Sequence, residues 1–129
     1  MNEQVKPPHI IVMEDEPVIR ELICKSLRKK GYEVQEAPDG KVAIDLFLSL
    51  DVDTRTRTVL VLDLIVPGGL GGRETLLEIR QIAPAVKAII ASGLADDNAL
   101  ADLEETGKTG ILTKPYNLKD LDEALRSVW

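Results

Sequence analysis

Short apolar runs alternate along the chain with longer segments in which apolar residues recur every three or four positions. Uninterrupted apolar runs are typical of parallel strands that are buried on both faces, and the longer segments are typical of the helices that cover such strands. The pattern therefore predicts an α/β fold with a parallel sheet and crossover helices. The expected strands span residues 9–13, 32–37, 59–62, 86–91 and 110–113.

Five helices are expected to follow these strands, each with one apolar face. The first spans 17–30, because Pro17 suits a first helical turn and Gly31 ends the helix. Asn117 is the expected N-cap of the last helix, with Asp120 three residues later. The expected inward positions are Ile19, Leu22, Ile23, Ser26 and Leu27, then Ala43, Leu46, Phe47 and Leu50, then Leu76, Ile79 and Ala83, then Leu100 and Leu103, and last Leu118, Leu121, Leu125 and Val128. The expected loops are 51–58, which is polar, and 66–72, which is rich in glycine.

Composition and charge narrow the function classes. The chain has 129 residues, 44% of them hydrophobic and 29% charged, which suits one domain over 9–129 after a polar tail over 1–8. The net charge of −6 argues against direct contact with nucleic acid. The single cysteine, Cys24, falls just beside the expected apolar stripe, so an unreactive thiol is expected.

Targeting signals are not expected in this sequence. No run approaches the ~20 apolar residues that cross a bilayer, and the first four residues lack the profile of a signal peptide. A cytoplasmic location is therefore the expectation.

Polar side chains follow four of the expected strands at the point where each strand ends. Glu14 and Asp15 follow the first strand, Asp63 the third, Ser92 the fourth and Lys114 the fifth. Because the carboxyl ends of parallel strands share one edge of the sheet, these groups are expected to lie together. Each alone is more typical of a cap or a turn, so the functional interpretation depends on their joint placement.

The expected cluster has the groups needed to receive a phosphoryl group. Three carboxylates repel one another unless a cation lies between them, and an all-oxygen site favours Mg²⁺, with Mn²⁺ as the alternative metal. Asp63 is the expected nucleophile, because a carboxylate is already ionised at neutral pH. Lys114 and Ser92 are expected to contact the oxygens of the transferred group.

Four motifs in order resemble those of response-regulator receiver domains over nearly the whole chain. They are residues 11–17 (IVMEDEP), residues 61–64 (VLDL) with Pro67 and Gly71 downstream, residues 91–93 (ASG) and residues 113–116 (TKPY). The resemblance implies a flavodoxin-like (CheY-like), doubly wound parallel sheet with strand order 2-1-3-4-5 and five helices. It also implies a phosphohistidine donor on a sensor histidine kinase or a histidine phosphotransfer protein.

The resemblance also implies a role for each site residue. Asp63 takes the phosphoryl group, Lys114 pairs with its oxygens, and Ser92 is the hydroxyl that moves toward them. Asp15 binds Mg²⁺ directly together with Asp63, Glu14 binds it through water, and Ile65 binds it through its main-chain carbonyl. The peptide bond between Lys114 and Pro115 is implied to be cis.

Some positions depart from the common receiver pattern. Glu14 replaces the more usual aspartate, and Ile111 stands where many receivers have a switching aromatic residue. Ile65 and Leu94 flank the acceptor with apolar bulk and offer no group to orient a water, so slow self-dephosphorylation is expected. The loop 67–72 looks most like that of receivers attached to hybrid sensor kinases.

Two alternatives and the mode of output stay open. A degenerate receiver would bind proteins without taking phosphate, and an aspartate-nucleophile phosphatase of the haloacid-dehalogenase type would need a second acid where Ile65 stands. Output is expected through the face formed by the fourth helix, fifth strand and fifth helix, with Lys108, Lys119 and Arg126 as candidate charges. A monomer or a weak, phosphorylation-dependent dimer is expected, either as a stand-alone protein or as part of a hybrid kinase.

Overall fold

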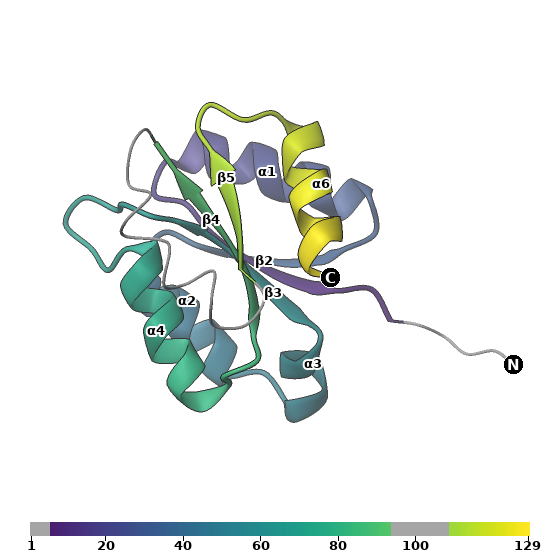
Figure 1. The fold of residues 1–129 in the computed structure, drawn as a ribbon, viewed down its shortest axis with the longest axis vertical. Helices are drawn as coiled ribbons and strands as arrows, with labels where there is room; N and C mark the ends of the chain where they lie inside the picture. Colours follow the sequence, from purple (N-terminus) through teal and green to yellow (C-terminus); the bar gives the residue numbers. More distant parts are fainter. Residues whose placement is uncertain (1–5, 94–108) are drawn as a thin grey trace, which may run out of the picture.

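A five-stranded parallel sheet runs through the centre of the computed structural model, which describes residues 6–93 and 109–129 (Figure 1). The strands are β1 (His9–Met13), β2 (Glu33–Ala37), β3 (Thr58–Asp63), β4 (Lys87–Ser92) and β5 (Thr109–Thr113). Their order in the sheet is β2-β1-β3-β4-β5, with every neighbouring pair parallel. The predicted fold class and strand order are thus confirmed.

Helices cover both faces of this sheet. The helices in the described residues are α1 (Pro17–Lys29), α2 (Gly40–Leu48), α3 (Val52–Thr56), α4 (Gly72–Ile82) and α6 (Leu118–Val128). Figure 1 shows α1 and α6 on one face and α2 and α4 on the other. The helix expected around Leu100 and Leu103 lies outside the described residues. The described helices do not include one long and apolar enough to pass through a membrane.

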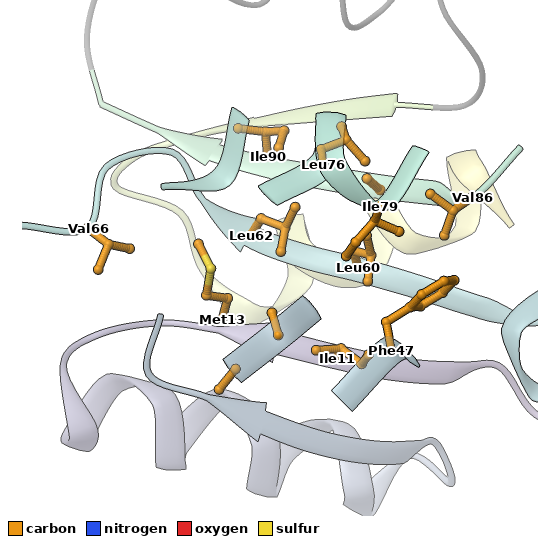
Figure 2. Packing of buried hydrophobic residues seen from close by; sticks show 13 residues of the cluster. Ile11, Met13, Phe47, Leu60, Leu62, Val66, Leu76, Ile79, Val86 and Ile90 are labelled. Atoms are coloured by element: carbon orange, nitrogen blue, oxygen red, sulfur yellow. The ribbon is translucent and has the colours of Figure 1, made fainter. Parts of the chain in front are cut away.

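Alternate strand residues enter two separate cores. On the α2 and α4 face, Met13, Leu60 and Leu62 pack with Phe47 and other side chains (Figure 2). The opposite cluster contains Ile10, Val12, Val59, Val61 and Ile89, with side chains from α1 and α6. Burial on both faces explains why the strands read as continuous apolar runs.

The register brings the carboxyl ends of four strands level with one another. Met13 pairs with Leu62, and Asp63, one residue further along β3, pairs with Ala91. Ser92 pairs in turn with Thr113. The residues that follow these pairs therefore emerge at one edge of the sheet, as the sequence predicted.

The inward face of α1 differs from the prediction. Ile23, Cys24 and Leu27 are buried, whereas Leu22 is 60% exposed and Ile19 is 38% exposed. Cys24 lies in the core, and burial raises the pKa of its thiol to about 11, so the thiol is protonated at neutral pH. The spacing of the hydrophobic residues misled the prediction, because exposed apolar side chains are common at protein surfaces.

The segment expected as a polar loop contains the short helix α3. The Asp51 side chain accepts a hydrogen bond from the Thr54 amide at 2.7 Å, which caps the helix. Arg55 then donates to the carbonyls of Phe47 and Leu48 at the end of α2. The alternating Thr and Arg residues are therefore structural contacts as well as solvated side chains.

The start of α6 and the glycine-rich loop agree with the prediction only in part. Asn117 and Asp120 form the predicted capping box of α6, but Leu118 is 36% exposed and does not enter the core. The glycine-rich segment is a loop only as far as Gly71, because Gly72 is the first residue of α4.

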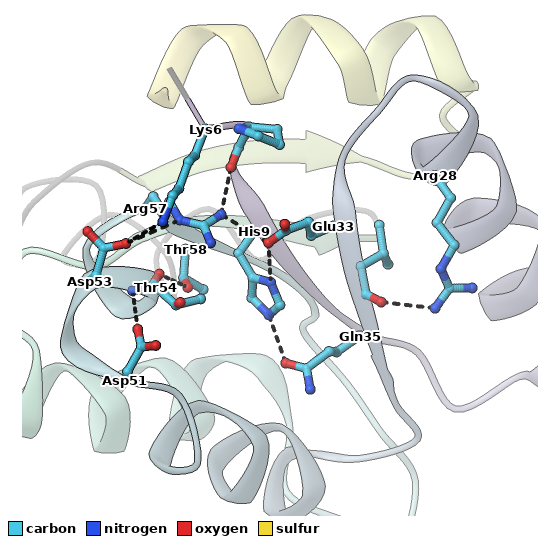
Figure 3. A network of polar contacts seen from close by, with 12 residues as sticks. Lys6, His9, Arg28, Glu33, Gln35, Asp51, Asp53, Thr54, Arg57 and Thr58 are labelled. Atoms are coloured by element: carbon cyan, nitrogen blue, oxygen red, sulfur yellow. Dashed lines mark hydrogen bonds and ion pairs between the residues drawn. The ribbon is translucent and has the colours of Figure 1, made fainter. Parts of the chain in front are cut away.

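A polar network closes the amino-terminal end of the sheet (Figure 3). Arg57 donates to the Pro7 carbonyl at 2.8 Å and to the Glu33 carboxylate at 3.0 Å. His9 Nε2 lies 2.7 Å from the side-chain oxygen of Gln35. These contacts join the chain before β1, the first residue of β1 and the residue before β3 to the first half of β2.

Candidate functional site

Asp63 is the last residue of β3 and is held by its neighbours on both sides. Its side chain is 8% exposed. The amide of the next residue, Leu64, donates to the Ala91 carbonyl at 2.9 Å. On the helix side, a Cβ atom on Gly72 would lie 2.6 Å from the Asp63 carbonyl oxygen, so only glycine fits there. The position of Asp63 is therefore fixed by main-chain packing.

Two further carboxylates meet Asp63. Carboxylate oxygens of Glu14, Asp15 and Asp63 all lie within 4.8 Å of one another. The Glu14 amide donates to the Ala37 carbonyl at 3.0 Å, and Glu14 Oε2 accepts from the Glu16 amide at 3.1 Å. The predicted convergence of three acids is present in the structure.

Lys114 completes the cluster from the end of β5. Its Nζ atom lies 2.9 Å from Asp63 Oδ1. Its amide donates to the Ser92 carbonyl at 2.7 Å, which extends the pairing of β4 and β5 by one residue. The peptide bond between Lys114 and Pro115 is cis, as the receiver motif implied.

The charges in this cluster are not balanced. Burial raises the pKa of Glu14, and the negative charge of Asp63 and a hydrogen bond with Asp15 raise it further. The Glu16 amide and the Lys114 ammonium act in the opposite direction. Crowded oxygen donors with excess negative charge are the ligands that hard divalent cations prefer. The residues present therefore fit a magnesium or manganese ion.

Ser92 and Ile65 lie at the same edge in different settings. Ser92 is 4% exposed, and its hydroxyl donates to the Gly93 carbonyl at 3.0 Å. Ile65 follows Asp63 by two residues, and its side chain is 65% exposed. The structure thus brings Glu14, Asp15, Asp63 and Lys114 into one cluster, with Ser92 one residue beyond the partner of Asp63. Leu94 lies outside the described residues.

Two residues beside this cluster were not predicted from the sequence. Burial raises the pKa of Tyr116 to about 12, with smaller contributions from the charges of Glu14 and Asp63. Arg20 donates from Nη1 to the Glu14 carbonyl at 2.8 Å. Tyr116 stood inside a quoted motif, but its spacing gave no sign of a nearby acid. Arg20 lies six residues from Glu14, and a separation of six between a strand end and the next helix does not predict a contact.

The family model for the response regulator receiver domain matches residues 10–126. Sensor kinase CckA of Brucella abortus (strain 2308) is 31% identical over 121 residues, which are 92% of this chain and 12% of that protein. Transcriptional regulatory protein TcrA of Mycobacterium tuberculosis (strain ATCC 25618 / H37Rv) is 32% identical over 127 residues, which are 97% of this chain and 47% of that protein. The chain spans less than half the length of both relatives.

A solved structure has the same architecture. The crystal structure of a response regulator receiver domain protein from Clostridium thermocellum superposes with a TM-score of 0.80 at 30% sequence identity. The similarity covers 94% of this chain and 93% of the other.

Proposed function

Since the chain belongs to the response regulator receiver domain family, we propose that it receives a phosphoryl group on Asp63 in two-component signalling. The donor is a phosphohistidine on a sensor histidine kinase or on a histidine phosphotransfer protein. The observation that carries this proposal is the 2.9 Å contact between Lys114 Nζ and Asp63 Oδ1 beside two further carboxylates.

The proposed transfer needs no separate base. A carboxylate oxygen of Asp63 attacks phosphorus while the bond from phosphorus to the imidazole nitrogen of the donor breaks. The bonding electron pair stays on that nitrogen, and the imidazole leaves neutral when its other nitrogen carries a proton. The Lys114 ammonium offsets the negative charge on the equatorial phosphoryl oxygens.

Magnesium is the proposed cofactor of this step, and manganese is the proposed substitute. Asp15 and Asp63 would bind the ion directly, Glu14 through water, and Ile65 through its carbonyl. When bound, the ion supplies positive charge against the carboxylates and the phosphoryl oxygens. Glu14 is one methylene longer than aspartate but keeps the same charge, so it suits a contact through water.

Ser92 is the proposed switch between the unphosphorylated and the phosphorylated state. Its hydroxyl would leave the Gly93 carbonyl and donate to a phosphoryl oxygen, so phosphorylation would favour one arrangement of this strand end. Ile111 stands in place of an aromatic partner and packs against the core on the α2 and α4 face. The proposed switch therefore depends on Ser92 and the chain that follows it.

The proposed output surface includes β5 and α6. Lys119 and Arg126 are its candidate charges on α6, while Lys108 lies outside the described residues. Arg126 already pairs with Asp122 at 3.2 Å, but its side chain is 77% exposed. A downstream protein would compete with Asp122 for the exposed charge of Arg126.

Labelling with a small phosphodonor tests the proposal directly. We expect acetyl phosphate with Mg²⁺ to add one phosphoryl group to the parent and none to Asp63→Asn, as measured by intact mass. Beryllofluoride should likewise bind only the parent. Phosphotransfer from a panel of sensor kinases would then identify the donor.

The same experiment separates the alternatives. A folded parent that takes neither acetyl phosphate nor beryllofluoride would be a degenerate, protein-binding receiver. Steady release of product from p-nitrophenyl phosphate would instead indicate a phosphatase.

Slow loss of the phosphoryl group is part of the proposal. Ile65 follows the proposed acceptor by two residues, and its apolar side chain offers water no hydrogen bond that could orient it for attack. Purified phosphoprotein followed by intact mass should therefore persist well beyond seconds, and a lifetime of seconds would contradict this prediction.

A further inference from the structure

Arg20 connects α1 and β2 to the turn formed by residues 14–16, here called the acidic turn. It lies in the first turn of α1, and its Nη1 atom donates to the Glu14 carbonyl at 2.8 Å. Its Nε atom lies 3.4 Å from Glu36 Oε1 on β2. The side chain is only 19% exposed, so the contact is made in a partly buried setting.

From these contacts we propose that Arg20 is a positioning residue for the metal site. It holds the main chain of Glu14, and through it the turn that presents Glu14 and Asp15 to Asp63. The inference rests on the proposed function, because it concerns the affinity of the same acidic cluster for a divalent cation.

The acidic turn needs such a restraint. Three carboxylates with oxygens within 4.8 Å of one another repel, and opening the turn would relieve that repulsion. The Glu14 amide is held by the Ala37 carbonyl at 3.0 Å. The Glu14 carbonyl is held by Arg20, so the peptide groups on both sides of this residue are fixed.

Glu36 in turn holds Arg20 in place. The carboxylate of Glu36 contacts Arg20 through one oxygen and Arg28 through the other, at 3.4 and 3.1 Å. A guanidinium can bond to a carbonyl and a carboxylate at the same time, because its donors form a rigid fork. Lysine at position 20 would have the charge but not this geometry.

Arg28 provides a matched control. It pairs with the same carboxylate on Glu36 and donates to the Val34 carbonyl at 2.9 Å. It comes from the same helix as Arg20, but both of these partners, Glu36 and Val34, lie on β2. Replacing Arg28 by glutamine therefore removes the same charge from the same network.

Binding of Mn²⁺ to the whole chain, measured by the electron paramagnetic resonance of the free ion, tests the proposal without phosphorylation. Residues that orient metal ligands typically contribute about 10-fold or more in affinity, so Arg20→Gln should weaken Mn²⁺ binding by about 10-fold. Arg28→Gln should stay within about 2-fold of the parent, since it leaves the Glu14 carbonyl bond in place.

A second measurement needs no metal. Amide hydrogen exchange of residues 14–16 should become faster in metal-free Arg20→Gln and stay unchanged in Arg28→Gln. If Arg20→Gln does not fold, as judged by circular dichroism, Arg20→Lys decides instead. Mn²⁺ binding weakened by about 3-fold or more would support the proposal, since lysine lacks the fork, and parent affinity would contradict it.

The outcomes distinguish this inference from the proposed function. Parent-like Mn²⁺ affinity in folded Arg20→Gln overturns the positioning role but leaves phosphorylation of Asp63 untouched. An equal loss in Arg20→Gln and Arg28→Gln also overturns it, because the effect would then be one of charge. A parent that binds no Mn²⁺ overturns both the inference and the proposed metal site, whereas labelling of Asp63 is measured separately.

Discussion

The two ends of the sheet both carry partly buried charges, but they balance them differently. At the amino-terminal end, Arg57 bonds to Glu33 and to a main-chain carbonyl, and this cation lowers the pKa of Glu33 (Figure 3). At the carboxyl-terminal end, three acids lie together, Lys114 pairs with Asp63 among them, and the pKa of Glu14 is raised.

The difference indicates what each end is for. Paired charges and satisfied carbonyls favour one fixed arrangement, as a structural network requires. Unbalanced carboxylates favour the binding of a cation from solution, and the ammonium beside them favours an anion such as a phosphoryl group. Electrostatic imbalance therefore distinguishes the end of the sheet that we propose to be functional.

The largest effect is expected from Lys114→Met. Removing the ammonium should lower the rate of phosphorylation by acetyl phosphate by about 100-fold or more, since one lost transition-state contact commonly costs this much. The same change should leave Mn²⁺ affinity equal or stronger, because the cluster becomes more negative. A rate within about 2-fold of the parent would contradict the proposed role.

Gly72→Ala tests how tightly the carboxyl-terminal end of the sheet is packed. Alanine normally favours a helix over glycine, but here its Cβ would meet the Asp63 carbonyl. We expect a loss of about 1–3 kcal/mol in the free energy of unfolding, measured with urea. Gly93→Ala is the control, because a Cβ there meets no atom of residues 6–93 or 109–129 within 4 Å. Equal stability of Gly72→Ala and the parent would exclude the packing argument.

Arg57→Gln should affect the other end alone. Losing the bonds to Pro7 and Glu33 should cost about 1–2 kcal/mol in unfolding free energy. The rate of phosphorylation should stay within about 2-fold of the parent, because Arg57 lies at the opposite edge from Asp63. A large fall in that rate with the fold intact would show that the two ends are coupled.

The smallest effect concerns pH in the metal-free protein. The raised pKa of Glu14 means that the folded state holds this proton more tightly than the unfolded state. That contribution to stability is complete below the ordinary value of 4.5 and is lost as pH rises through the folded value. Glu14→Gln should therefore be more stable than the parent at neutral pH. The difference should shrink in urea titrations as pH falls.

Glu33 should respond to pH in the opposite sense. Its lowered pKa favours the folded state above its ordinary value, and this contribution is lost as the pH falls through the folded value. Glu33→Gln should thus be less stable than the parent at neutral pH and equal to it in acid. The same sign for Glu14→Gln and Glu33→Gln would contradict the contrast between the ends.

The meeting of Asp63 and Lys114 was predictable because strand order and direction decide it. Continuous apolar runs identified the strands, and parallel pairing places their carboxyl ends together. The prediction did not depend on the number of residues between Asp63 and Lys114. The capping box of α6 was predictable for a different reason, because both of its residues lie within one turn.

Contacts that depend on side-chain direction were not predictable. A polar residue in a helix normally predicts an exposed position. Arg20 nevertheless lies on the inward side of α1, because it bonds to Glu14 and Glu36. Its partner on β2 lies sixteen positions away. The helix α3 was missed because Asp51 caps a segment with no apolar face of its own. The local pattern of apolar and polar residues therefore predicts neither the distant partners of Arg20 nor a short helix that depends on its cap.

The main-chain bonds beyond the strand ends have a consequence for engineering. The Leu64 amide bonds to the Ala91 carbonyl and the Lys114 amide bonds to the Ser92 carbonyl, so the strands bearing acceptor, hydroxyl and lysine are locked in register past their last paired residues. The segment between Gly93 and Thr109 could thus be exchanged for that of another receiver, to change the choice of partner, without changing the position of Asp63.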